Sequence, residues 1–356
     1  MQSKQQTTDF FLGALSPTGF HGYFETLAAQ DGLRLYLIKS GPGCGKSTLM
    51  KRLAERAEGP VERIHCSSDP DSLDGVLLWQ YHAGALDATA PHTLEPAQPG
   101  ARERVVSLYH TFDNEKLAAD AGKISALFGR CGCLQARAAR YIASASALLL
   151  DSRRTAACCL DAEKAGRYAA GLAARCLPKT GREGSEQVRL LSAVTPKGIL
   201  VFWDTVPALA DRLVVFEDEY GAASRLILER LRAEALRRGH RVITCRCAMA
   251  QEDKIDHLLL PELRLAFLTS NSWHRMQFAG QQNVHCTRFA DPDALRARRR
   301  RLQFNRKAAA ELLAQASAMQ REAKRSHDAL EGYYKSAVDF AGVDAARDAL
   351  FAELGL

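Results

Sequence analysis

The stretch that decides the expected fold is Ser40-Gly-Pro-Gly-Cys-Gly-Lys-Ser47-Thr48. It follows the apolar segment Leu33–Ile38, which predicts a β-strand, and it precedes a helical stripe of apolar side chains between Leu49 and Ala57. The three glycines let the backbone turn tightly and direct its N–H groups inward. A glycine-rich turn between a strand and a helix is the arrangement that binds phosphate groups, because the N-terminus of the helix adds a partial positive charge.

The residue types in this turn predict a site for a nucleoside triphosphate, taken as ATP, together with Mg²⁺. The residues expected to bind the nucleotide are Gly41, Pro42, Gly43, Cys44, Gly45, Lys46, Ser47 and Thr48. Lys46 should reach the β- and γ-phosphates as a catalytic residue, and the hydroxyl of Ser47 should bind Mg²⁺. Ser40 takes the place of the first glycine of the G-x-x-x-x-G-K-[ST] pattern, which weakens the match slightly.

Polar residues that follow the neighbouring predicted strands extend this candidate site. Asp87 ends the predicted strand Ala83–Asp87 and is the candidate carboxylate for Mg²⁺ and catalysis, with a capping or solvated position as its alternative. Asp69 and Asp71 could position water or a substrate hydroxyl, and turn or capping roles are at least as well supported. His92 could sense the γ-phosphate, although a structural role is the stronger expectation.

The sequence also repeats itself across its two halves. The segment Phe11–Phe20 resembles Leu190–Ile199, and Asp74–Leu78 resembles Asp256–Leu260. Because such pairs keep the same order and nearly the same offset along the chain, a duplication explains them better than chance does.

Each half therefore predicts the same α/β plan, a parallel sheet flanked by helices and followed by a helical segment. The predicted strands are Leu33–Ile38, Val61–Cys66 and Ala83–Asp87 in the first half, and Arg212–Phe216, Arg241–Cys245 and Arg264–Leu268 in the second. The helical segments cover about residues 113–177 and 291–355 and are expected to form hairpins on, or projecting from, the sheet. The expected domains are a nucleotide-binding domain at 1–178, a linker at 179–187 and a second repeat at 188–356.

The second repeat lacks the features that bind phosphate. Its loop reads Phe216-Glu-Asp-Glu-Tyr-Gly-Ala-Ala-Ser-Arg-Leu226, with one glycine, no lysine before the serine and three acidic residues that would repel phosphate. Thr269 takes the place of Asp87. We therefore expect a degenerate copy that keeps the fold and has lost the nucleotide.

Four segments together resemble an uncharacterised bacterial family of tandem P-loop ATPases, and the resemblance covers essentially the whole chain. They are Leu15–Gly19, Gly41–Ser47, His65-Cys-Ser-Ser-Asp-Pro-Asp-Ser-Leu-Asp-Gly75 and Asp87–His92. The resemblance implies a duplicated P-loop NTPase fold, nucleotide binding and ATP hydrolysis. Members of the family carry a glycine-rich loop with lysine in both halves, and this chain departs from them in its second half.

The composition, with 47% hydrophobic and 25% charged residues, is typical of a soluble globular protein. No apolar run approaches the ~20 residues that span a membrane, and the N-terminus shows no signal-peptide pattern, so a cytoplasmic location is expected. The two C-x-C pairs among the ten cysteines, Cys131/Cys133 and Cys245/Cys247, fit buried or reduced thiols better than a metal site.

Two other functions compete with an ATPase. A nucleotide or small-molecule kinase would need lid arginines, for which Arg130, Arg137, Arg140, Arg153 and Arg154 are candidates. A nucleotide-gated nucleic-acid-binding protein would use the basic run Arg296–Arg301, although aromatic residues are few there. A protein partner or a homo-oligomer is also compatible with a P-loop ATPase.

Overall fold

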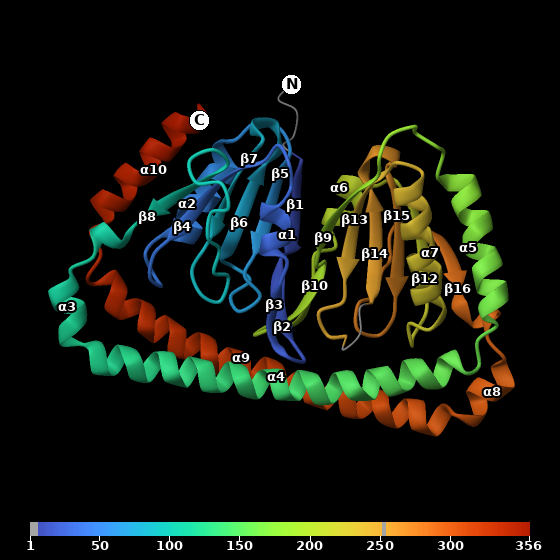
Figure 1. Ribbon diagram of the computed structural model, residues 1–356. Helices are drawn as coiled ribbons and strands as arrows, with labels where there is room; N and C mark the ends of the chain where they lie inside the picture. Colours follow the sequence, from blue (N-terminus) through green and yellow to red (C-terminus); the bar gives the residue numbers. More distant parts are fainter. Residues whose placement is uncertain (1–5, 251–253) are drawn as a thin grey trace.

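The computed structural model, which describes residues 6–250 and 254–356, contains two six-stranded mixed sheets flanked by helices (Figure 1). The first sheet has the strand order β1 (Thr7–Phe11), β5 (Val61–His65), β6 (Leu73–Leu78), β7 (Ala83–Asp87), β4 (Arg34–Lys39) and β8 (Glu103–Ser107). The second repeats this order as β9 (Ser185–Arg189), β13 (Arg241–Arg246), β14 (Ile255–Leu260), β15 (Leu265–Ser270), β12 (Arg212–Glu217) and β16 (Gln282–His285). The α/β class expected from the sequence is therefore confirmed.

The expectation of parallel sheets is wrong at one strand in each half. β6 runs antiparallel to β5 and β7, and β14 runs antiparallel to β13 and β15. Only residues 79–82 separate β6 from β7, and so short a connection cannot make the crossover that a parallel pair needs. The remaining pairs in both sheets are parallel, including β4 with β7 and β12 with β15. The carboxyl ends of β4 and β7 therefore still meet at one edge of the first sheet.

The two halves join where the edge strands β1 and β9 come together. Phe11 and Leu190 exchange two backbone hydrogen bonds of 2.9 Å, and one apolar core contains residues from both sheets. Each half places a hairpin and a short helix at this junction: β2 (Gly13–Ser16), β3 (Gly19–Gly22) and α1 (Phe24–Ala28), then β10 (Ser192–Thr195), β11 (Gly198–Val201) and α6 (Thr205–Leu209). The junction is thus a continuous buried interface.

The helices that end each half pack on the opposite half (Figure 1). The helical segments are α3 (Asn114–Ala119), α4 (Ala121–Ala157) and α5 (Ala162–Cys176), then α8 (Pro292–Ala297), α9 (Arg299–Lys335) and α10 (Phe340–Leu354). α4 and α9 lie side by side along both sheets, which carries α5 to α7 (Ala223–Arg237) and α10 to α2 (Lys46–Arg56). The segments lie where the sequence predicts them, but each is exchanged between the halves instead of forming a hairpin on its own sheet.

A further expectation concerns the segment that joins the two halves. β9 begins at Ser185, inside the segment 179–187 that the sequence suggests as a linker.

In the ranges 6–250 and 254–356, no helix combines the length and the apolar character that crossing a bilayer requires.

Candidate functional site

The glycine-rich loop connects β4 to α2, as the sequence predicts. Gly43 and Gly45 have φ angles of 69° and 82°, in the left-handed region that glycine adopts without steric cost, and Gly45 is the N-cap of α2. No side chain caps this helix end, so its first N–H groups have no side-chain partner there. The loop therefore combines the backbone conformation and the helix N-terminus that phosphate binding requires.

Lys46 lies across this loop beside Asp87. Its Nζ donates to the carbonyl oxygens of Gly41, at 2.8 Å, and Ser40, at 3.3 Å, and lies 3.4 Å from a carboxylate oxygen of Asp87. The side chains of Lys46 and Asp87 are 12% and 14% exposed, so water screens this contact only partly. β7 ends at Asp87 beside β4, and this pairing brings the carboxylate to the lysine.

A second buried carboxylate, Asp74, lies behind this pair and was not singled out as a site residue from the sequence. Burial raises the pKa of Asp74. The charge of the nearby Asp87 raises this pKa further, whereas the charge of His92 lowers it. The His92 Nε2 lies 3.5 Å from Asp74 Oδ1, and its ring packs against Phe20 and Phe24. The match between Asp74 and Asp256 in the two repeats was the available signal. His92 is thus placed beside Asp74, within an aromatic cluster.

Asp69 and Asp71 pair with lysines other than Lys46. Asp69 accepts a hydrogen bond from the Ser72 hydroxyl and lies 3.3 Å from Lys324 of α9. Asp71 is 74% exposed and pairs with Lys197 in the second half at 2.7 Å. Both ion pairs join the loop after β5 to other elements.

The carboxyl end of α9 covers the glycine-rich loop, a contact that the sequence does not reveal. A β-carbon added to Gly41 would lie 2.7 Å from the ring of Tyr334, and one added to Gly43 would lie 3.0 Å from the backbone oxygen of Glu331. Burial raises the pKa of the Tyr334 phenol. The loop of the first half therefore contacts a helix that belongs to the second half.

In the second half, a carboxylate occupies the loop that corresponds to the glycine-rich loop. Asp218 follows β12 as Ser40 follows β4, and its side chain accepts from the backbone N–H groups of Tyr220 (3.3 Å), Gly221 (3.1 Å) and Ser224 (2.8 Å). Thr269 pairs with Phe216 in the register in which Asp87 pairs with Ile38. Asp218 thus satisfies the N–H groups that would otherwise be available to a phosphate.

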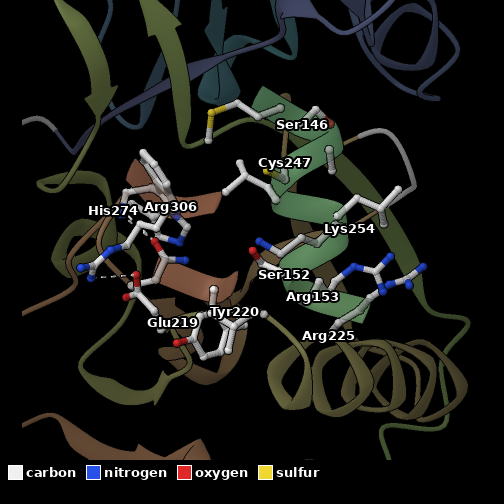
Figure 2. Close-up of a pocket in the computed structure, with 18 residues that line it drawn as sticks. Ser146, Ser152, Arg153, Glu219, Tyr220, Arg225, Cys247, Lys254, His274 and Arg306 are labelled. Carbon is white, nitrogen blue, oxygen red and sulfur yellow. Dashed lines mark hydrogen bonds and ion pairs between the residues drawn. The ribbon is translucent and has the colours of Figure 1, made fainter. Parts of the chain in front are cut away.

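A pocket lies at this end of the second sheet, between its loops and the helices α4 and α9 (Figure 2). It encloses about 800 Å³, including the solvent at its mouth. Its lining includes Lys254, whose Nζ lies 2.5 Å from Asp256, and Arg306, whose guanidinium lies 3.8 Å from Glu219. No local pattern in the sequence indicates this pocket, because α4 reaches it from the first half.

The candidate lid arginines lie along α4. Arg130, Arg137 and Arg140 are exposed, and none of them bonds to Gly41–Thr48 within the described residues. Arg153 lines the pocket of the second half. In the basic run, Arg301 pairs with Asp151 and Arg296 pairs with Asp293.

The ten cysteines are all present as free thiols. Cys245 is buried and Cys247 is half-buried, and burial raises the pKa of both thiols, that of Cys247 to about 12. Across residues 6–250 and 254–356, no three His, Cys, Asp or Glu side chains group as a metal site would need.

Comparison of the chain with protein-family models, with curated proteins and with solved structures gives no match.

Proposed function

We propose that the first half binds Mg-ATP at Gly41–Thr48 and hydrolyses it, and that the second half has no equivalent nucleotide site. The observation that carries the proposal is Lys46, which lies across the carbonyl groups of a glycine-rich loop and 3.4 Å from Asp87 at the carboxyl edge of β4 and β7. Loops at this edge of an α/β sheet are the usual place for a ligand.

The groups around Lys46 suit the steps of phosphoryl transfer. The loop N–H groups and the N-terminus of α2 would bind the phosphate chain, and Lys46 would leave the carbonyl groups of Ser40 and Gly41 for the phosphate oxygens. Ser47 and Asp87 provide the hard oxygen ligands that Mg²⁺ prefers, and they would hold the ion. When bound, Mg²⁺ neutralises charge on the transferred phosphoryl group. Asp74, behind Asp87, would orient this cluster.

The contact between the loop and α9 gives the site a route to the rest of the molecule. Because Tyr334 and Glu331 lie against Gly41 and Gly43, rearrangement of the loop around a phosphate chain would displace the end of α9. α9 packs along α4 and so reaches both halves. We propose that turnover acts on this helix pair, which could in turn contact a protein partner or a second copy of the chain.

The test is the release of phosphate from Mg-ATP by the intact chain and by three variants. Lys46→Ala and Asp87→Asn should each lower the rate by a factor of about 100 or more, because each removes charge stabilisation from the transferred group. Lys51→Ala, an exposed lysine of α2, is the matched control and should hydrolyse ATP as the native chain does. Equal rates for Lys46→Ala and Lys51→Ala would refute the proposal.

A further inference from the structure

The pocket of the second half has mainly apolar walls and closely placed charged groups. Leu149 comes from α4, Leu302 from α9, and Met249 and Trp273 from the loops of the second sheet. Such walls suit the body of an organic molecule better than they suit a hydrated inorganic ion.

Four cationic side chains share this lining with one carboxylate. They are Arg153, Arg225, Lys254 and Arg306, and the carboxylate is Glu219. Figure 2 shows Lys254, Arg153 and Arg225 grouped on one side of the pocket and Arg306 with Glu219 on the other. Asp256 lies behind Lys254, the charge of Asp218 acts on Lys254, and Asp151 pairs with Arg301 nearby, so these carboxylates offset part of the positive charge. Among the described residues of the lining itself, four cations share the pocket with one carboxylate. The charge favours an anionic ligand.

Two buried polar atoms in the same lining lack a partner. Ser146 and His274 are each 2% exposed, and the Ser146 Oγ and the His274 Nδ1 make no hydrogen bond within the part of the chain that the structure describes. Buried polar groups are nearly always hydrogen-bonded, and a buried group without a partner destabilises the fold. A ligand in the pocket would provide the missing partners.

We infer that this pocket binds a small organic anion with an apolar or aromatic body, and that it does so through side chains. Lys254 and Arg306 would face the anionic group, Ser146 and His274 would make polar contacts, and the apolar walls would enclose the body. The backbone N–H groups of the loop before α7 would take no part, because they already donate hydrogen bonds to the carboxylate of Asp218. The pocket is therefore a second, chemically different site, separate from the nucleotide site that we propose for the first half.

The experiment uses the fluorescent anion anilinonaphthalene sulfonate as the probe. In a chain carrying Trp79→Phe and Trp203→Phe, Trp273 is the single tryptophan left, so energy transfer from it reports binding in the pocket. We expect saturable binding of one probe per chain. The uncharged analogue phenylnaphthylamine should bind at least tenfold more weakly, because it lacks the anionic group.

Substitutions of residues that line the pocket test whether the probe binds there. Arg306→Gln should weaken binding about tenfold, whereas Arg296→Gln, a matched exposed arginine on α8, should leave it unchanged. Ser146→Leu should abolish binding by filling the cavity; if that chain does not fold, the two arginine variants still decide. Equal affinity in both arginine variants, or equal affinity for the uncharged analogue, would overturn the inference.

Adding Lys46→Ala separates the two proposals. The probe should still bind this variant, and Mg-ATP should not displace it from the native chain. Competition between Mg-ATP and the probe for a single site would overturn the inference that the pocket is a separate site, whatever the outcome of the hydrolysis assay.

Discussion

At the scale of single residues, two loops at corresponding places differ in what satisfies their N–H groups. The loop before α2 offers glycines and Lys46, whereas the loop before α7 holds the carboxylate of Asp218 against three N–H groups. The sequence shows the acidic residues and predicts repulsion of phosphate. Only the structure shows that Asp218 points into the loop, because its direction depends on the conformation around Gly221 (φ 66°).

Gly43 should be intolerant of a side chain. Gly43→Ala should lower the free energy of unfolding by about 1–2 kcal/mol, since an L residue is strained at a φ of 69° and its β-carbon would meet Glu331 at 3.0 Å. Gly129→Ala is the control, because no atom lies within 4 Å of the added carbon and a helical alanine is favoured. Urea titration compares the two. Equal midpoints would show that the loop is not held against α9.

His274 should make the protein sensitive to acid. Burial lowers the pKa of His274 to about 4 from 6.5, with Lys254 lowering it further and Asp256 opposing. The folded chain then binds fewer protons than the unfolded chain, so this contribution, up to about 3 kcal/mol, is complete above about pH 6.5 and is lost towards pH 4. Burial also lowers the pKa of the nearby His257, so the protein loses further stability in acid through this second histidine.

The check is urea unfolding at about pH 7, above both pKa values of His274, and at about pH 5, between them. His274→Asn should lose less stability between the two conditions than the native chain, and the exposed His110→Asn should behave as the native chain does. A native chain equally stable at both pH values would rule out this contribution of His274.

At the scale of elements, the sequence predicts what local pattern determines. The strand, glycine-rich turn and helix around residue 40 were identified because their signals are contiguous. β6 was missed, since a fully buried run such as Leu73–Leu78 lacks the alternation that marks a strand. The exchange of α5 and α10 between halves was also missed, because it depends on the α4–α9 pair and on no local signal.

α10 should stabilise the first half, although it ends the second. Phe351 is 4% exposed in a core with Leu49 and Leu53 of α2, so Phe351→Ala should cost about 3–5 kcal/mol. Phe340→Ala, in the same helix but 45% exposed, should cost less than about 1 kcal/mol. Thermal and urea unfolding measure both, and similar losses would mean that α10 does not cover this core.

At the scale of the whole molecule, a buried ion pair links the halves. Arg189 of β9 and Glu62 of β5 are 1% and 2% exposed and bonded to each other. Arg189→Met should lower the free energy of unfolding by about 3–5 kcal/mol, because it leaves the buried carboxylate of Glu62 without its partner. The double variant Arg189→Met/Glu62→Leu should recover most of that loss. Arg182→Met, at a surface pair with Glu262, is the control and should cost under about 1 kcal/mol. Urea titration follows all three variants, and a double variant no more stable than Arg189→Met would contradict this linkage.

We propose that the two similar halves hold one nucleotide site and one different pocket. The most direct measurement is calorimetric titration of the intact chain and of Lys46→Ala with Mg-ATP. We expect one nucleotide bound per native chain and none per Lys46→Ala chain. Two nucleotides per native chain, or binding that survives in Lys46→Ala, would contradict it.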